Sequence, residues 1–286
     1  VEEATKLDVV FTPKIQVLSE VVLNAKKTKV FELKRLKDVE GTTINAGRKT
    51  EVVLVEQSMA NLASNNSRQI YSQVSGLNIY ENDDAGIQLH IGGRGLDPNR
   101  TSNFNTRQNG YDISPDVLGY PESYYTPPAE ALKEIQIIRG ASSLQYGTQF
   151  GGLVNFVIKS PNSTKSLELI SRNTIGSNKL YTNFTSLSGT KGKFSYYTFF
   201  NFKQGDGFRD NSKFNSKNAF FHLSYQLTNK TSISTEFTYL NYLAQQAGGL
   251  SDDIFSKDPF QSNRSRNWFG LDWFLYNLKL KSELND

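Results

Sequence analysis

The chain has 286 residues, a net charge of +4 and no cysteine, and aromatic residues make up 12% of it. The lack of cysteine excludes a disulfide scaffold, thiolate metal sites and cysteine nucleophiles. The small charge gives no argument for nucleic-acid binding, because no run of lysine or arginine exceeds two residues. No segment approaches about 18 consecutive apolar residues, which excludes a transmembrane helix but not transmembrane strands.

The first 29 residues contain two β-like runs, residues 7–11 and 17–23, separated by Pro13, which cannot lie in a central strand. Lysines at positions 26, 27 and 29 then indicate a solvated linker. No signal peptide opens the chain. We expect both ends to be cuts in a longer polypeptide, with residues 1–16 the end of a small N-terminal β domain.

Residues 30–161 mix short strands with short helices, which predicts a small α+β domain. Ile87, Leu89 and Ile91 alternate with polar residues, a pattern typical of a half-buried strand. Asn109-Gly110 predicts a tight turn. Strands are expected over residues 51–55, 87–91, 134–138 and 153–158.

Two helical segments are expected in the same region. The first covers residues 67–74 and stops at Gly76. Its N-cap is one of Asn65, Asn66 or Ser67. The second is a single turn over residues 129–133, after two prolines.

From residue 162 onward the pattern is uniform, with alternating stretches of about 9 to 11 residues, the length that crosses a membrane as a tilted strand. Ile233, Phe237 and Tyr239, for example, alternate with serine, threonine and glutamate. The last stretch is ambiguous, because both of its faces carry large apolar residues. Six strands are expected, over residues 166–175, 179–188, 193–203, 216–227, 231–242 and 268–281.

The connections between these strands alternate in length. They are short after the second and fourth strands and long after the third and fifth, where they cover residues 204–215 and 243–267. The link after the first strand, residues 176–178, is the exception, because it is short although it lies at the end where the long loops lie. This is the layout of an outer-membrane barrel, whereas a soluble β-sandwich has no reason to place all of its long loops at one end. Six strands cannot close such a barrel, so we expect more strands beyond Asp286.

Glycines mark the strand ends between positions 90 and 159, and singly each indicates an ordinary turn. In chain order the motifs are Ile91-Gly92-Gly93-Arg94-Gly95, Asn109-Gly110, Glu134-Ile135-Gln136-Ile137-Ile138-Arg139-Gly140, Tyr146-Gly147 and Gly151-Gly152-Leu153-Val154-Asn155. Together they resemble the plug of TonB-dependent receptors. The chain departs from that pattern at Gly93, where many members have arginine, and at Asn109, where aspartate is usual.

The resemblance implies an α+β plug domain over residues 30–161, followed over residues 162–286 by the first six strands of an antiparallel transmembrane β-barrel of about 22 strands. It implies the outer membrane of a Gram-negative cell, with lipid around the barrel and the plug reached from the periplasm. Gly95-Leu96-Asp97-Pro98, Thr101-Ser102 and residues 261–273 are similar to the ferric dicitrate receptors of this family. The implied function is import of a ferric chelate, such as ferric citrate or another siderophore, with no cofactor.

Residues 17–25 resemble a TonB box. Together with the linker that follows, the box makes up the segment of residues 17–29. Such a run can add as a strand to the sheet edge of the TonB-ExbB-ExbD complex and carry a pulling force. The alternative is the last strand of a preceding domain, since the segment from Lys6 to Pro13 resembles the end of a carboxypeptidase-regulatory-like domain. The box residues are Val17, Leu18, Ser19, Glu20, Val21, Val22 and Leu23.

The loop over residues 96–107 is expected to face the outside and bind the chelate. An anionic iron complex suits arginines and hydroxyls through charge-assisted hydrogen bonds. The candidates, each of which could instead be a solvated loop residue, are Arg100, Thr101, Ser102, Arg107, Arg264 and Arg266. Arg94 and Arg139 each end a plug strand, and the resemblance implies that they pair with barrel glutamates and lock the plug, unless they are solvated.

His90 and His222 are the only histidines, so a direct metal site is not expected. No motif of a hydrolase, metalloprotease or phosphate-binding loop is present, so no enzyme is expected either. Two alternatives to iron uptake stay open. One is TonB-dependent uptake of a peptide, glycan or cobalamin. The other is a barrel that transports nothing and acts in adhesion or assembly.

Overall fold

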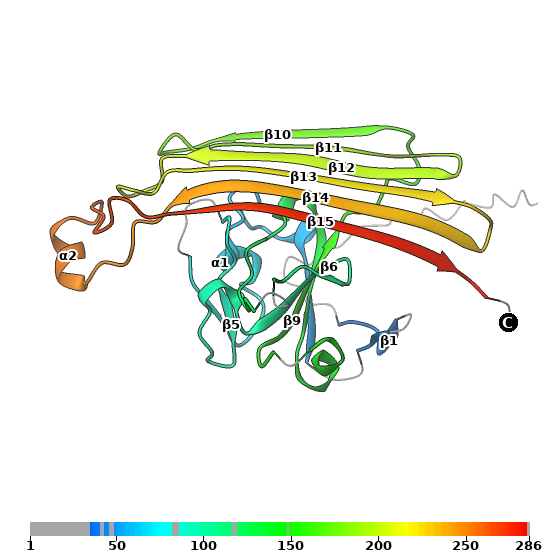
Figure 1. The fold of residues 1–286 in the computed structure, drawn as a ribbon, viewed down its shortest axis with the longest axis horizontal. Helices are drawn as coiled ribbons and strands as arrows, with labels where there is room; N and C mark the ends of the chain where they lie inside the picture. Colours follow the sequence, from blue (N-terminus) through cyan, green and yellow to red (C-terminus); the bar gives the residue numbers. More distant parts are fainter. Residues whose placement is uncertain are drawn as a thin grey trace, which may run out of the picture.

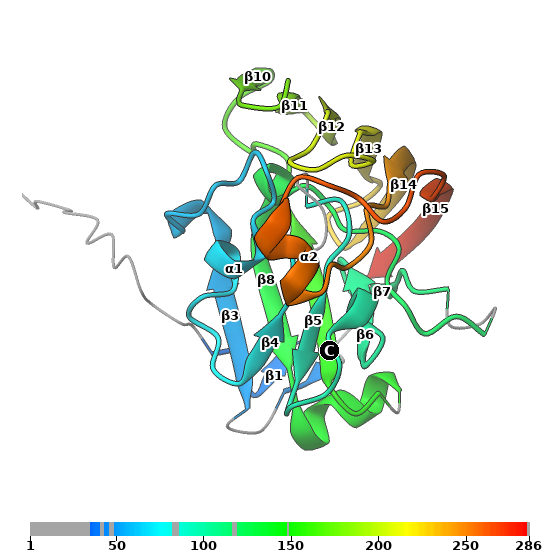
Figure 2. The same ribbon diagram turned by 90° about the vertical axis from the view of Figure 1, so that its left-hand side faces the viewer.

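The computed structural model describes residues 35–40, 43–45, 49–81, 86–115, 119–147 and 149–284. A mixed domain over residues 50–158 lies beside a long curved antiparallel sheet over residues 168–282 (Figure 1). Viewed along its strands, the curved sheet covers one side of the mixed domain like a section of a cylinder (Figure 2). The predictions for residues 1–29, a β-domain remnant and a TonB box, lie outside the described residues.

The mixed domain is built on a five-stranded sheet with the order β3-β8-β9-β6-β7. Its neighbouring strands are antiparallel except for the parallel pair β6 and β9. Two hairpins, β1-β2 and β4-β5, accompany it. The strands are β1 Val39–Glu40, β2 Thr43–Ile44, β3 Thr50–Leu54, β4 Leu77–Ile79, β5 Ile91–Gly93, β6 Phe104–Gln108, β7 Tyr111–Asp112, β8 Leu132–Ile138 and β9 Gly152–Ile158.

Helical segments in this domain are short. They are α1 Ser67–Ile70 and the 3-10 turns η1 Val55–Gln57, η2 Asn99–Thr101, η4 Ala129–Ala131 and η5 Gly140–Tyr146. Asn66 caps α1, because its side-chain oxygen accepts a hydrogen bond from the Gln69 amide at 2.9 Å. The helix is one turn shorter than predicted, and the chain reverses at Gly76 with a φ of 69°.

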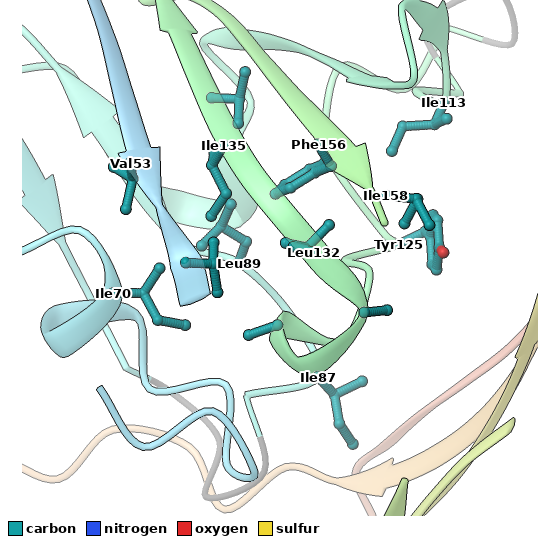
Figure 3. Packing of buried hydrophobic residues seen from close by; sticks show 14 of the residues in the cluster. Val53, Ile70, Ile87, Leu89, Ile113, Tyr125, Leu132, Ile135, Phe156 and Ile158 are labelled. Carbon is teal, nitrogen blue, oxygen red and sulfur yellow. The ribbon is translucent and has the colours of Figure 1, made fainter. Parts of the chain in front are cut away.

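The core of the mixed domain gathers residues from strands that are far apart in the sequence. Val53, Ile135 and Phe156 come from three adjacent strands and are at most 4% exposed (Figure 3). Ile70 of α1 and Leu89 pack into the same cluster. Alternation along each strand turns one apolar face toward these neighbours, and burial of that face stabilises the domain.

The strand predicted over residues 87–91 is only partly confirmed. β5 begins at Ile91, and residues 87–90 form no strand. Side chains take the place of a strand partner here, since the Thr101 hydroxyl donates to the Leu89 carbonyl at 2.8 Å and accepts from the Ile91 amide at 3.2 Å. His90, expected on the polar face, is buried as well. Alternation predicted which apolar residues of this segment are buried. The hydrogen bonds of its backbone depend on Thr101, which lies in a separate loop.

All six strands predicted for the second region are confirmed, with bounds that shift by a few residues. Each pairs antiparallel with the next in chain order. The strands are β10 Glu168–Ile175, β11 Tyr181–Lys191, β12 Phe194–Gly205, β13 Phe214–Gln226, β14 Thr231–Gln245 and β15 Trp268–Ser282. The single short helix α2, Asp252–Lys257, lies in the last long loop. Among the described residues, no helix is long and apolar enough to span a membrane.

The two faces of the curved sheet differ in polarity. In β14, Glu236 and Thr238 point toward the mixed domain and are buried, while Phe237 between them is 38% exposed on the outer face. In β15, where the sequence left the inner face ambiguous, one apolar row packs against the buried cluster that the mixed domain and the curved sheet share. That inner row is Phe269, Leu271, Trp273 and Leu275. The other row is exposed and comprises Phe274, Tyr276, Leu278 and Leu280.

Candidate functional site

The two long loops, residues 206–213 and 246–267, lie at one end of the curved sheet and are tied to each other. Arg209 donates to the Gly248 carbonyl at 2.6 Å and twice to the Gln261 carbonyl, at 3.0 and 2.8 Å. The rings of Phe208 and Phe260 lie 4.8 Å apart between centroids. Because one guanidinium holds both loops, they form a single structural unit (Figure 1).

A cavity of about 650 Å³ lies between this loop unit and the mixed domain. The mixed domain contributes Tyr80, Glu81 and Gln88 to its lining, and the loop side contributes Phe208 and Arg209. The Arg209 guanidinium already donates hydrogen bonds to backbone carbonyls, so those donors do not serve a ligand in this cavity. None of the six predicted chelate-binding residues lines this cavity.

Arg100 lies beside the long-loop end of the curved sheet, as part of an aromatic platform. Its guanidinium carbon is 4.9 Å from the ring centroid of Phe269 and 5.7 Å from that of Tyr124. The two rings are themselves parallel, with centroids 5.5 Å apart. Arg100 also donates a hydrogen bond to the Tyr124 side chain. Stacking on aromatic faces leaves the remaining in-plane N–H donors of an arginine available to an anion. The geometry therefore suits Arg100 to a negatively charged ligand.

The backbone holds Arg100 in this place. Its φ is 46°, in the left-handed region that is costly for a non-glycine residue. Its amide donates to Nδ1 of the buried His90 at 2.9 Å, which assigns the acceptor role to that ring nitrogen. His90 therefore has a structural part in positioning Arg100.

The remaining candidates are not brought together with Arg100. Thr101 is fully buried and its hydroxyl bonds to the backbone, so the structure gives it a structural role rather than presenting it to a ligand. Ser102 is partly buried in the turn after η2. Arg264 and Arg266 are exposed in the last long loop.

Arg107 lies in β6, on a different part of the domain. Its Nε donates to Asn105 Oδ1 at 2.8 Å and its Nη1 donates to the Gly110 carbonyl at 2.7 Å. Its guanidinium carbon is 4.8 Å from the ring centroid of Tyr146, beside a second cavity of about 440 Å³ that Lys279 also lines. Lys279 is near the end of β15 opposite to Phe269. Arg100 and Arg107 therefore serve different places.

The sequence of residues 45–153 matches the family described as TonB-dependent Receptor Plug Domain. This part of the chain is a TonB-dependent receptor plug domain. The curved sheet that follows it is the wall against which the plug packs. Because this receptor family is non-enzymatic, the match also confirms the expectation that the chain is not an enzyme. A comparison with curated proteins finds no sequence that matches the chain.

Solved structures with the same fold are transporters and receptors of low sequence identity to this chain. The ferric citrate transporter FecA in its unliganded form aligns with a TM-score of 0.65 and 20% identity, over 84% of this chain and 38% of FecA. A mutant of the ferric enterobactin receptor PfeA from Pseudomonas aeruginosa aligns with a TM-score of 0.58 and 16% identity, over 84% of this chain and 39% of PfeA. The copper transporter OprC aligns with a TM-score of 0.57 and 16% identity, over 77% of this chain and 33% of OprC. The chain thus spans between 33% and 39% of these receptors, and the likeness establishes a plug followed by barrel strands.

The two arginines expected to lock the plug have different surroundings. Arg139 forms an ion pair with Glu51 inside the plug, and its Nη1 donates to the Ser75 carbonyl at 2.9 Å. Arg94 is exposed, with a φ of 60°. Neither has an ion pair with the six described wall strands. Their pairing with barrel glutamates stays a prediction.

Some contacts between the plug and the wall are polar, and few signals in the sequence predicted them. Asn109 Nδ2 donates to Glu236 Oε1 at 2.9 Å, and His222 Nδ1 lies 3.0 Å from the same oxygen. Gln108 Nε2 donates to Thr238 at 3.1 Å. The available signal was the polar row of each wall strand, which had to face something polar. In the part of the chain that the structure describes, no group of acidic residues and histidines could hold a metal ion.

Proposed function

We propose that this chain belongs to an outer-membrane, TonB-dependent transporter that brings a ferric chelate, such as ferric citrate or another siderophore, into the periplasm. The observation that carries the proposal is Arg100, held on the Phe269–Tyr124 platform at the long-loop end of the plug. One ring of the platform belongs to the plug and the other to the wall. A ligand bound there contacts both parts of the receptor.

The charge and hydrogen-bonding capacity of Arg100 support an anionic cargo. An iron chelate built on carboxylates offers planar acceptors that match the fork of a guanidinium. The likeness to FecA, whose name assigns it ferric citrate, agrees with this choice. The exposed aromatic and aliphatic row of the wall supports a lipid environment for the outer face.

Replacing Arg100 by alanine is expected to weaken ferric citrate binding by about 10- to 100-fold, because a charge-assisted hydrogen bond of roughly 1.5–3 kcal/mol is lost. Quenching of tryptophan fluorescence measures the affinity, since Trp268 adjoins Phe269 in β15. Arg68→Ala is the matched control, because Arg68 is an exposed arginine of α1 away from the platform. Equal affinity of the Arg100→Ala variant and the parent receptor would contradict the assignment of the cargo site.

Energy for uptake is proposed to come from TonB-ExbB-ExbD through residues 17–23. Deleting these residues is expected to abolish energy-dependent uptake of the radiolabelled chelate while leaving its binding affinity unchanged, because the box lies outside the cargo platform. Undiminished uptake by the deletion variant would exclude the box. Deleting residues 1–7 instead serves as the length control and is expected to preserve uptake.

A neutral cargo is the second candidate, favoured by the lining of the 650 Å³ cavity. Its side chains include amides, hydroxyls and the rings of Tyr80 and Phe208; its arginine is engaged by carbonyls, and its carboxylate, Glu81, pairs with Arg68. The same fluorescence titration separates the candidates. Binding of a neutral siderophore or an oligosaccharide, with no response to ferric citrate, would favour the second.

A further inference from the structure

A buried carboxylate of the plug lies against the wall at Glu130. It belongs to η4, whose alanines on either side are also buried. The turn is fixed from two sides, because the Ala129 amide donates to Asn65 Oδ1 at 2.7 Å and the Lys159 amide donates to the Ala131 carbonyl at 2.9 Å. The Glu130 side chain is only 6% exposed.

One cation of the wall contacts this carboxylate, and a second acts on it electrostatically. Nη1 of Arg172, on the inner face of β10, is 3.5 Å from Glu130 Oε1. Lys203, on the inner face of β12, is buried and acts on Glu130 electrostatically. Burial raises the pKa of Glu130 above its ordinary value, while Arg172, Lys203 and Lys159 oppose that rise. A buried carboxylate deprived of its cations is strongly destabilising, so this contact favours the docked position of the plug.

We infer that the ion pair of Glu130 and Arg172 is an electrostatic clamp that holds the plug against the wall and sets how readily the plug moves. The carboxylate is on the plug and the cation is on the wall, the opposite of the arrangement expected for Arg94 and Arg139. Glu130 acts as a positioning residue. The inference rests on the proposed function only in that plug movement is taken to admit the cargo.

The clamp lies near the place where the chain leaves the plug. Lys159, whose amide bonds beside Glu130, ends the plug, and residues 160–167 lead directly into β10. The clamp therefore secures the side of the plug where the chain enters the wall.

A single cysteine can report displacement of the plug, because the chain contains none. Ser186 lies on the inner face of β11 and is 4% exposed, so Ser186→Cys reacts with a maleimide when the plug leaves the wall. In this background, in the full receptor and without cargo or energy source, Glu130→Gln and Arg172→Gln are each expected to raise the labelling rate about fivefold. The double variant is expected to label no faster than Glu130→Gln alone, because that change already removes the charge that Arg172 contacts.

Glu51→Gln is the matched control, since it breaks the Glu51–Arg139 pair inside the plug without touching the wall. It is expected to leave the labelling rate unchanged. Unchanged labelling in Glu130→Gln, equal acceleration by Glu51→Gln, or a double-variant effect equal to the product of the single effects would overturn the clamp. Arg172 is half-exposed, so its variant tests the idea even where Glu130→Gln fails to fold. Because no cargo is present, the result does not depend on which chelate the receptor carries.

Discussion

Replacing Phe156 by alanine is expected to destabilise the plug domain by about 3–5 kcal/mol, the usual cost of removing a large buried aromatic side chain. Phe156 lies in the central strand β9 and is fully buried between Ile135 of β8 and Gln108 of β6. The loss combines the transfer of apolar surface to water with a cavity that rigid sheet neighbours cannot fill. The urea concentration at which a protease pulse cuts the plug measures the effect in the intact receptor.

Phe150→Ala is the control for this experiment. Phe150 is a phenylalanine of the same domain that is 79% exposed. Its removal is expected to change the stability of the plug by less than about 0.5 kcal/mol. Comparable shifts for the two variants would mean that the core does not lie where the structure places it.

Replacing Phe221 by arginine is expected to destabilise the folded barrel by about 2–4 kcal/mol, the cost of a cation on the lipid face near the bilayer midplane. Phe221 is near the middle of β13 and is 47% exposed on the outer face of the wall. Urea titration of the receptor in lipid vesicles, followed by the mobility difference between folded and unfolded barrel in gels, measures the change.

Depth supplies the control for the barrel experiment. Leu227 lies at the short turn after β13 and is similarly exposed, at 45%. Leu227→Arg is expected to cost about 0–1 kcal/mol, because penalties fall near the membrane interface. If Phe221→Arg is no worse than Leu227→Arg, the outer face of the wall does not meet lipid.

The parts of the fold that the sequence predicted best are those governed by local chemistry. The Asn109-Gly110 turn adopts positive φ angles of 49° and 88° and joins β6 to β7 as expected. The six wall strands followed from alternation and from turn positions. Such signals act between neighbouring residues, so they are readable without knowledge of the tertiary contacts.

The binding role of the six candidate residues stays a prediction, and the structure does not bring them together around Arg100. Four were taken from residues 96–107 and two from the last long loop. The chain enters β6 at Phe104, and an extended strand advances by about 3.3 Å per residue, which carries Arg107 away from Arg100. The partners of Arg100 come from residues 124 and 269, which no local pattern connects. Thr101 was chosen by resemblance, and its burial depends on the backbone of a segment ten residues earlier.

The sequence by itself determined the strands, the turns, the order of the two regions and the plug motifs, since each depends on residues that are close together in the chain. Tertiary structure alone decided which row of β15 faces the plug, which loops share Arg209, and which carboxylate pairs with Arg172. These outcomes depend on pairing between distant segments, where burial of apolar faces and the cost of unpaired buried charge select one arrangement. The glycine motifs thus define a plug, while its contacts with cargo and wall are set by residues that only the folded chain brings together.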